Sequence, residues 1–221
     1  PLKVSEVDLD SLLLARSFSV EQGLKPDGTP KYRACDDESR NGNNPCCRVR
    51  EKLRNDSIDG FISLVALLTM ALGCVPSFWK ADIDSAYRRV PVKPEHRWLL
   101  WVAVLVGSDV WVSGHNACCF GATASVHAWN RIGAFLCHIG RKLLHLPLLR
   151  YVDDYFAADH PDNTKHAMNC FARIVRAVLG GSSVAERKLH FGMPLEVLGV
   201  DITATMDTIF AWPTKDKIKK W

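Results

Sequence analysis

The chain has 221 residues, 48% of them hydrophobic and 24% charged, which is ordinary for a globular protein with one large domain or two small ones. Its net charge of +4 is compatible with a polyanionic partner but is too small to indicate one. Eight cysteines include two adjacent pairs but no Cys-x-x-Cys, which argues against a zinc ribbon or a compact disulfide framework and favours a reducing compartment, the nucleus or the cytoplasm.

The histidines that lie near cysteines do not form a metal-binding motif. His115 is close to Cys118, and Cys137 is followed by His138, but no second pair stands at ligand spacing. We therefore interpret these thiols as small buried hydrophobic groups rather than as metal ligands.

The N-terminal segment, residues 1–24, has no features of a secretory signal peptide. Its run PLKVSEVDLDSLLLA places acids ahead of the apolar residues and lacks a small-residue cleavage pattern, so we do not expect a secreted protein. From residue 25 to residue 55 the composition changes to glycine, proline, asparagine, cysteine and many charged residues. This change predicts a hairpin followed by an exposed loop.

A charge-free stretch, GFISLVALLTMALGCVPSFW, follows this loop. Its strongly apolar part, residues 61–75, is shorter than the ~20 residues that a membrane-spanning helix needs, and Pro76 closes it. The stretch therefore predicts a buried helix rather than a membrane span, and we expect no membrane partner. Asp56, Ser57 or Asp59 could cap its N-terminus.

The middle of the chain alternates strand and helix patterns. FWKADIDSAY begins with strand character, and RWLLWVAVLVGSDVWVSG predicts a β-hairpin that turns at residues 107–109. ASVHAWNRIGAFLCHIGRKLL, residues 124–144, has apolar residues at helical spacing. We therefore expect a strand, a hairpin and a helix in this order.

The run LLRYVDDYFAAD places two adjacent acids, Asp153 and Asp154, inside a stretch of aliphatic and aromatic residues typical of strands. Because an Asp-Asp pair favours a tight turn, the run predicts a hairpin with both acids at its tip. Taken alone, the pair could equally be turn-formers that face water.

A second helix is predicted over residues 161–179, with Asp162 or Asn163 as its cap and Gly180-Gly181 as its end. LEVLGVDITA and TIFAW then read as strands, and KDKIKKW as the start of a helix. This order of elements predicts an α+β domain with helices on one face of an antiparallel sheet.

Asp82 ends the first central strand, and the Asp153-Asp154 hairpin could lie beside it on an adjacent strand. Three clustered carboxylates repel one another and stay ionised together only if cations neutralise them. Mg²⁺ is the natural candidate, and two such ions, ~4 Å apart, stabilise both the attacking and the leaving oxygen of a phosphoryl displacement.

Five motifs in order resemble the fingers and palm of reverse transcriptases of the retroelement type. They are KPDGTPKYRACDD, ADIDSAYRRVPV, CFGATAS, YVDD and RKLHFGMPLEVLGVDI. The resemblance implies a right-hand palm with a ferredoxin-like antiparallel sheet over residues 81–204, and a fingers region with the connecting buried helix over residues 25–80. Residues 205–221 would begin the connection to a thumb, and the thumb and further domains are expected in a longer chain.

The resemblance also implies the catalytic residues. Asp82 and Asp153 match the principal metal ligands, the carbonyl of Ile83 matches a backbone ligand, and Asp154 matches the third acid. Lys188 matches a lysine that protonates the leaving pyrophosphate, although a surface lysine on a loop is an equal alternative. Asp82 could instead be a simple strand-end residue.

A nucleotide pocket and a primer grip follow from the same resemblance. Lys25 and Arg33 match cations that hold the triphosphate, with Lys31 as an alternative to Lys25. Tyr87 matches an aromatic gate that leaves no room for a ribose 2′-OH. The remaining matched residues are Phe120 and Gly121 in the nucleotide pocket and Leu198 and Gly199 in the primer-grip turn. Cys119 departs from the family, which commonly has proline at this position.

The implied function is RNA-directed DNA polymerase, with two Mg²⁺ (or Mn²⁺ as a substitute), deoxynucleoside triphosphates and an RNA or DNA template with its primer. One alternative is a non-catalytic nucleic-acid-binding module derived from a reverse transcriptase, against which the three intact acids argue. The other is an RNA-copying RNA polymerase, which Tyr87 and Val152 disfavour, because such enzymes usually have glycine at the position of Val152.

Overall fold

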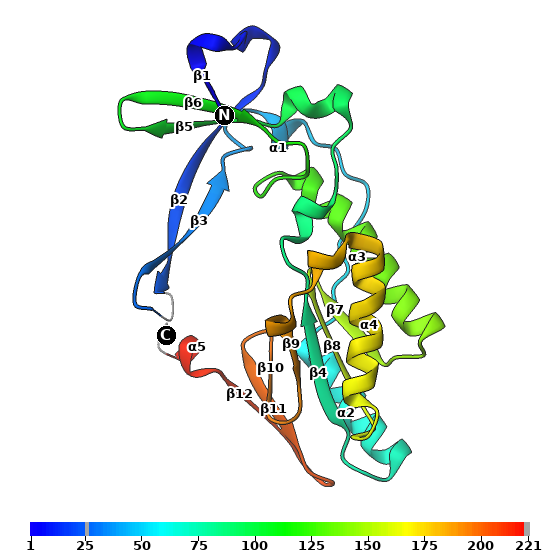
Figure 1. Cartoon of the computed structure of the whole chain (residues 1–221). Helices are drawn as coiled ribbons and strands as arrows, with labels where there is room; N and C mark the ends of the chain where they lie inside the picture. The colour runs from blue at the N-terminus through cyan, green and yellow to red at the C-terminus, as the bar shows by residue number, and fades with distance from the viewer. Residues whose placement is uncertain (25–26, 219–221) are drawn as a thin grey trace. The chain divides into compact units, whose positions relative to one another are not determined.

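The structure is a computed structural model that describes residues 1–24 and 27–218, except for the side chain of Asp216. Its contacts divide the chain into two compact units, which are interleaved along the sequence (Figure 1). The first unit comprises Pro1–Lys52 and Tyr87–Trp129, and the second comprises Leu53–Ala86 and Asn130–Trp221. Each unit is therefore built from two separate stretches of chain.

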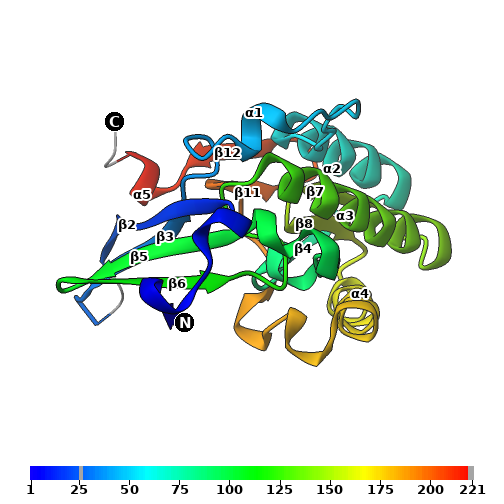
Figure 2. The same ribbon diagram turned by 90° about the horizontal axis from the view of Figure 1, so that it is seen from above.

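The first unit contains a five-stranded sheet with the order β1-β6-β5-β2-β3 (Figure 2). Its strands are β1 (Leu2–Lys3), β2 (Leu14–Leu24), β3 (Pro30–Asp36), β5 (Trp101–Val106) and β6 (Asp109–Gly114). All neighbours are antiparallel except β2 and β5, which are parallel. The predicted hairpin turning at residues 107–109 is confirmed as β5 and β6.

Short helices complete the first unit. They are α1 (Asn43–Cys46) and the 3₁₀ turns η1 (Val4–Glu6), η2 (Leu9–Ser11), η3 (Ala86–Arg89, which begins at the last residue of the other unit) and η4 (Pro94–Leu99). A small apolar cluster of this unit contains Leu100, Cys119 and Ala122, with Val92 and Leu99 packed against it. Cys119 thus serves as a core residue of this unit.

The second unit contains two antiparallel sheets. The larger has the order β7-β8-β4-β9, with β4 (Ser77–Asp82), β7 (Leu148–Tyr151), β8 (Asp154–Asp159) and β9 (Leu189–Phe191). The smaller has the order β10-β11-β12, with β10 (Leu195–Val197), β11 (Val200–Ala204) and β12 (Ile209–Pro213). The acid-containing run therefore forms the predicted hairpin, β7 and β8.

Helix α2 (Ile58–Leu72) is the charge-poor helix predicted after the loop. Ser57 caps it by accepting a hydrogen bond from the backbone N–H of Gly60 over 3.1 Å. Only Phe61, Val65 and Thr69 are buried, whereas Met70 is 85% exposed, so the prediction of a buried helix holds for one face only. Among the described residues, no helix is long and apolar enough to cross a bilayer.

The two other predicted helices are confirmed as α3 (Thr123–Leu143) and α4 (Thr164–Leu179). Asn163 stands at the N-cap of α4, but its side chain makes no capping hydrogen bond. The described part of the C-terminal run forms the short helix α5 (Lys215–Ile218). The 3₁₀ turns η5 (Gly181–Ser183) and η6 (Glu186–Lys188) connect α4 to β9.

The prediction of helices on one face of the sheet is wrong for the second unit. Phe78 packs against Phe61 of α2 with ring centroids 5.3 Å apart, whereas the next residue, Trp79, packs against Phe171 of α4 at 5.7 Å. Because successive strand residues point to opposite faces, α2 and α4 cover opposite sides of the sheet. The smaller sheet shares the α2 side, where Leu195, Val197 and Ile202 join the same core.

Candidate active site

Two of the predicted catalytic acids lie directly opposite each other on neighbouring strands. Asp82, the last residue of β4, pairs with Asp154, the first residue of β8. Asp82 and Asp154 lie on the same face of the sheet as Lys80, because successive side chains of a strand point to opposite faces. Asp153 lies in the turn before β8, and its carbonyl accepts a hydrogen bond from the backbone N–H of Ile83 over 3.1 Å. The fold thus brings Asp82, Ile83, Asp153 and Asp154 together.

Asp154 is the acid most perturbed by this arrangement. Burial, reinforced by the negative charges of Asp153 and Asp82, raises its pKa to about 6, although Lys80 and Lys188 oppose the shift. A pKa raised by burial and by like charges indicates carboxylates held close together at a cost in free energy. A positive charge bound among them would remove much of that cost.

Lys188 supplies such a charge in the described chain. Its ammonium nitrogen lies 2.8 Å from Oδ2 of Asp82 and 3.3 Å from Oδ1 of Asp84. Burial alone would lower the pKa of Lys188, but hydrogen bonds and the charges of the two aspartates raise it above its usual value. The lysine is therefore held as a cation against the acid cluster rather than on an open loop.

The donor set fits hard divalent cations. Carboxylate oxygens are the ligands that Mg²⁺ prefers, and one or two of them per ion suffice when water and phosphate oxygens fill the remaining positions. Asp82, Asp153 and Asp154 provide that set, and the ammonium of Lys188 already stands in for a cation beside Asp82. The chemistry such a cluster supports is the stabilisation of developing charge on phosphate oxygens.

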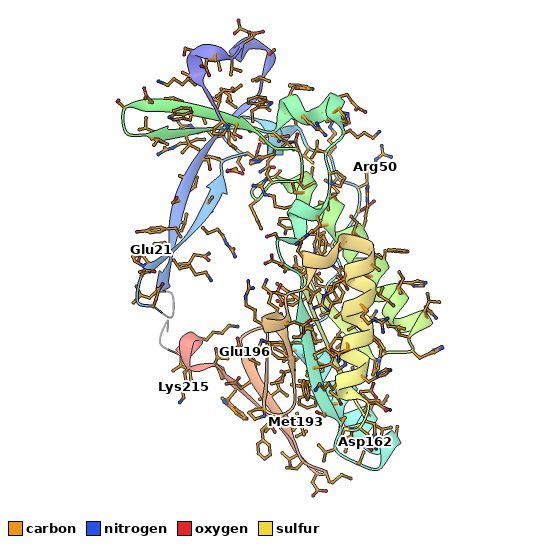
Figure 3. The ribbon with its side chains drawn as sticks, viewed as in Figure 1. Glu21, Arg50, Asp162, Met193, Glu196 and Lys215 are labelled. Carbon is orange, nitrogen blue, oxygen red and sulfur yellow. The ribbon has the colours of Figure 1, made fainter. Side chains whose placement is uncertain are left out.

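Two hollows adjoin the acids within the second unit. An open cleft of ≈ 570 Å³ is lined by Asn55, Val152, Asp153, Asp154 and Leu198, among others. A second hollow of ≈ 260 Å³ is lined by Lys80, Asp154, Leu198, Gly199 and Glu196, which Figure 3 labels on β10. The cluster is therefore accessible from the side that carries Leu198.

Leu198 and Gly199, the predicted primer-grip residues, form the two-residue turn between β10 and β11. Both have positive φ, 51° and 77°, as a tight hairpin turn of this hand requires. The carbonyl of Leu198 accepts a hydrogen bond from the ammonium of Lys217 over 2.8 Å. The predicted turn therefore exists and lines both hollows beside Asp154.

Three of the predicted nucleotide-binding residues meet in the first unit. The ring of Tyr87 lies 5.1 Å from that of Phe120, centroid to centroid, and the guanidinium of Arg33 lies 5.9 Å from the centroid of the Phe120 ring. The two rings are tilted by 58°, so the group is a packed aromatic pair with a cation over one of its rings. Lys25 lies outside the described residues.

Gly121, the fifth of these residues, has a structural reason to be glycine. Its φ is +102°, and a Cβ at this position would collide with the backbone carbonyl oxygen of Asp36. The carbonyl of Gly121 accepts a hydrogen bond from the side chain of Asn44 over 2.8 Å, and Asn44 also accepts one from the N–H of Thr123 over 2.7 Å. The loop before α3 is therefore held tightly although it lacks a proline.

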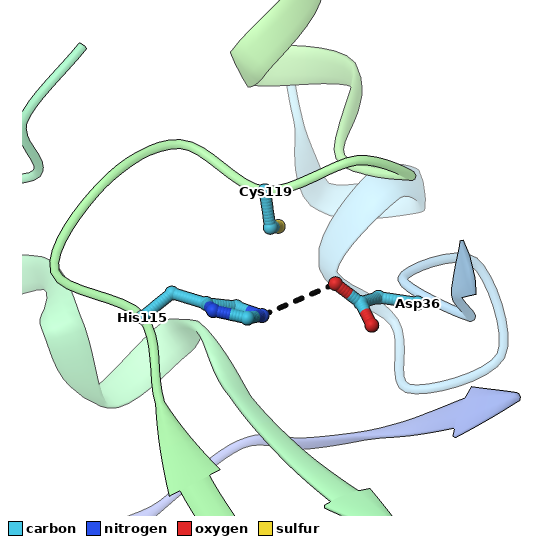
Figure 4. Close-up of side chains that lie close together, drawn as sticks. All are labelled: Asp36, His115 and Cys119. Carbon is cyan, nitrogen blue, oxygen red and sulfur yellow. Dashed lines mark hydrogen bonds and ion pairs between the residues drawn. The ribbon is translucent and has the colours of Figure 1, made fainter. Parts of the chain in front are cut away.

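Cys119, which occupies that proline's position, belongs to a buried polar cluster with Asp36 and His115 (Figure 4). Nε2 of His115 lies 3.1 Å from Oδ2 of Asp36, and the Cys119 thiol donates to Oε1 of Glu38 over 3.3 Å. Ligand atoms of Asp36, His115 and Cys119 lie within 4.8 Å of one another, close enough to consider a metal. The sequence paired His115 with Cys118 instead.

The hydrogen bonds of this cluster favour a network that closes without a metal. Arg88 donates to Nδ1 of His115 over 2.8 Å, which leaves the proton of a neutral imidazole on Nε2, where it is donated to Asp36. A metal on Nε2 would require Nδ1 to carry the proton and would displace Arg88. Burial and the charge of Glu38 also raise the pKa of Cys119 to about 12, which disfavours the thiolate that a metal needs.

Sequence reasoning missed the residues that support the acid turn. Asn55 and Asp56 accept hydrogen bonds from the backbone N–H groups of Val152 and Arg150, and the guanidinium of Arg150 donates to the carbonyl of Val152. The one available signal was the alternation in LLRYVDD, because Arg150 has the same inward parity as the buried Leu148. A charged residue at an inward position of a strand requires specific hydrogen-bond partners.

Comparison with known proteins gives a fold relationship alone. Neither family models nor curated proteins match the sequence. Among solved structures, the chain is similar to the native prototype foamy virus protease-reverse transcriptase, with a TM-score of 0.55 and 19% sequence identity. The match covers 86% of this chain but only 22% of the viral one. At this identity the two share a fold, and the chemistry of this chain must be argued from its own residues.

Proposed function

We propose that the chain is the polymerising part of an RNA-directed DNA polymerase that adds deoxynucleotides to a primer 3′-OH. The observation that carries the proposal is the pairing of Asp82 with Asp154 across adjacent strands, with Asp153 in the connecting turn. A shared fold with a protein named as a protease-reverse transcriptase supports it. We further propose that residues 81–204 are the palm, residues 25–80 the fingers with their connecting helix, and residues 205–221 the start of a thumb connection.

In this proposal Asp82 and Asp153, with the carbonyl of Ile83, would hold two Mg²⁺, and Asp154 would be the third acid. The ions would supply charge stabilisation for the attacking and leaving oxygens. The protein contributes positioning, because phosphoryl transfer depends on alignment and electrostatics rather than on covalent steps by side chains. Lys188 would release Asp82 when a cation takes its place and would then be free to donate a proton to the leaving pyrophosphate.

Deoxynucleoside triphosphates would bind through Lys25, Arg33, Phe120 and Gly121, and Tyr87 would exclude the ribose 2′-OH. Leu198 and Gly199 would contact the primer. Lysines and arginines would hold the backbone of the template–primer duplex, so its binding should weaken as the salt concentration rises. Tyr87 and Val152 disfavour the RNA-polymerase alternative, and the clustered acids disfavour a module that only binds.

The test is Mg²⁺-dependent primer extension on RNA and DNA templates, comparing the natural chain with Asp153→Asn. An amide has nearly the same shape as the carboxylate but no charge, so extension should fall by a factor on the order of 10³ or more while the far-UV circular dichroism stays unchanged. Asp207→Asn, an exposed acid in the turn between β11 and β12, is the matched control and should retain activity. Equal activity of folded Asp153→Asn and the natural chain would remove the assignment.

A further inference from the structure

The turn that carries Asp153 is strained at the residue before it. Val152 has a φ of 54°, in the left-handed region. A β-branched side chain is a genuine outlier in this region, because its Cβ crowds the following carbonyl. Such a conformation persists only where the surroundings hold it.

Side chains engage both polar groups of the Val152 backbone. Its N–H donates to Oδ1 of Asn55 over 3.2 Å, and its carbonyl accepts from Nη1 of Arg150 over 2.9 Å. Asn55 lies 97 residues away in the sequence, just before α2. The turn is therefore fixed by a group outside the hairpin as well as by one within it.

Arg150 is itself held firmly and is only 4% exposed. Its Nη2 donates to Oδ1 of Asn130 over 2.6 Å and to the carbonyl of Arg54 over 3.3 Å. Helix α3 passes so close that a Cβ on Gly133 would lie 2.6 Å from Nη1. A guanidinium spreads its N–H donors over three nitrogens in a rigid plane and so reaches three separated acceptors, whereas a lysine directs all its donors from one nitrogen.

The segment that contains Asn55 is fastened to the same strand. Asp56 donates its backbone N–H to the carbonyl of Arg150 and accepts the Arg150 backbone N–H on Oδ2, both over 2.8 Å. The same carboxylate oxygen lies 2.8 Å from the guanidinium of Arg141. Asn55 is therefore presented to Val152 at a fixed position rather than on a free loop.

We propose that Asn55 and Arg150 are positioning residues for the acid cluster: they hold Val152 in its left-handed conformation and so set the directions of Asp153 and Asp154 toward Asp82. The catalytic consequence rests on the proposed function, but the placement of the turn does not. If Asn55 and Arg150 only stabilised the fold, their effect would not depend on the backbone conformation of Val152. The distinguishing variable is therefore the backbone freedom of residue 152.

The variants follow from this distinction. Asn55→Ala removes the acceptor at an exposed position, so the fold should survive, and Asn163→Ala, an exposed N-cap residue without a capping hydrogen bond, is its matched control. Val152→Gly removes the crowding that makes φ > 0 unfavourable. Combining Val152→Gly with Asn55→Ala asks whether the asparagine is needed once the turn adopts this conformation by itself.

The first measurement is residue-resolved amide exchange of Asp153 and Asp154 in the metal-free chain. Exchange should be about tenfold faster in Asn55→Ala than in the natural chain, unchanged in Asn163→Ala, and largely restored in the double variant. Unchanged exchange in Asn55→Ala would overturn the proposal. If exchange is faster in Asn55→Ala and equally fast in the double variant, the proposal is also overturned. Asn55 would then not act by holding Val152 in its strained conformation.

The second measurement is the affinity for Mn²⁺, which is determined from the electron paramagnetic resonance signal of the free ion. Asn55→Ala should weaken binding by about 10-fold or more, the usual effect of removing a supporting residue behind metal ligands, and the double variant should bind like Val152→Gly alone. Affinity in Asn55→Ala equal to that of the natural chain would overturn the positioning of the acids. If the natural chain binds no Mn²⁺ while the exchange results hold, the proposed function fails and the positioning of the turn stands.

Discussion

Asp154 is a half-buried acid whose pKa departs from its usual value. Burial and the charges of Asp153 and Asp82 raise its pKa from 3.8 to about 6. A carboxyl whose pKa is higher in the folded chain binds its proton more tightly when folded, so the free energy of unfolding falls as pH rises from the unfolded pKa through the folded one. The ionised Asp154 therefore costs stability at neutral pH when no metal is bound.

We predict that Asp154→Asn stabilises the metal-free chain. At about pH 7.5 in a chelator, its free energy of unfolding should exceed that of the natural chain by about 1–3 kcal/mol, because a shift of ~2 pKa units is worth up to ~3 kcal/mol. The gain should vanish near pH 3.5, below both pKa values. Urea denaturation at the two pH values measures it, and a variant less stable than the natural chain at the higher pH would contradict the electrostatic account.

Tyr87 supports a prediction about sugar selectivity. Its ring packs against Phe120, with centroids 5.1 Å apart, so truncation to alanine should open space without unfolding the unit. If Tyr87 excludes the ribose 2′-OH, Tyr87→Ala should lower the preference for deoxynucleotides by a factor on the order of 10 to 100. Competition between dCTP and CTP on one primer–template measures the ratio. A natural chain that already prefers CTP, or a ratio that Tyr87→Ala leaves unchanged, would favour the RNA-polymerase alternative.

Strand ends in the first unit are joined by a polar network rather than by apolar contacts. Asp36, at the end of β3, accepts a hydrogen bond from His115, just after β6, and the guanidinium of Arg88 lies 3.9 Å away. Burial alone would raise the pKa of Asp36, but hydrogen bonds from His115 and Ser17 and the charge of Arg88 lower it below its usual value. Its contribution to stability is present above the unfolded pKa and is lost as pH falls through the folded one.

We predict that His115→Ala destabilises the first unit by about 1–3 kcal/mol, since a buried carboxylate loses one of its hydrogen-bond donors and keeps only Ser17 and the guanidinium of Arg88. The loss should shrink as pH falls below the pKa of Asp36, because a protonated carboxyl needs the histidine less. Thermal unfolding between pH 3 and pH 7 tests this, with the exposed His96→Ala as the control. Destabilisation that is independent of pH would mean that His115 acts through packing alone.

At the scale of elements, hydrophobic periodicity located most of the secondary structure. The hairpin of β5 and β6, the hairpin of β7 and β8, and helices α3 and α4 follow from local patterns and turn residues. The side of the sheet that each helix covers did not follow, because it depends on which strand residue a helix meets. Phe78 and Trp79 are both large and apolar, so the sequence alone does not show that Phe78 packs against α2 and Trp79 against α4.

The candidate site was predictable where chemistry is concentrated in short motifs. Asp82 and Asp154 pair on adjacent strands and Asp153 lies in the turn beside them, as their motifs indicate. The residues that support the acid turn were not predictable. Asn55 and Val152 are 97 residues apart, and neither residue type indicates that the two form a hydrogen bond. The ion pair of Lys188 with Asp84 is equally a product of tertiary structure, since Asp84 has no motif role.

At the scale of the whole molecule, each compact unit is assembled from two stretches of chain. The clustered acids and Lys188 belong to the second unit, whereas Arg33, Tyr87, Phe120 and Gly121 belong to the first. Composition and motif order cannot reveal such interleaving, because it depends on which distant segments pair. The viral protein that shares the fold is much longer, as this chain covers 22% of it.

Templated incorporation of a single nucleotide tests the central claim most directly. A primer annealed to RNA templates that differ only in the next base is incubated with the chain, Mg²⁺ and one deoxynucleotide at a time. We predict that the primer gains only the complementary nucleotide on each template, and that a chelator or Asp82→Asn abolishes the gain. A folded chain that binds the duplex and yet adds nothing, or adds nucleotides regardless of the template base, would contradict the account.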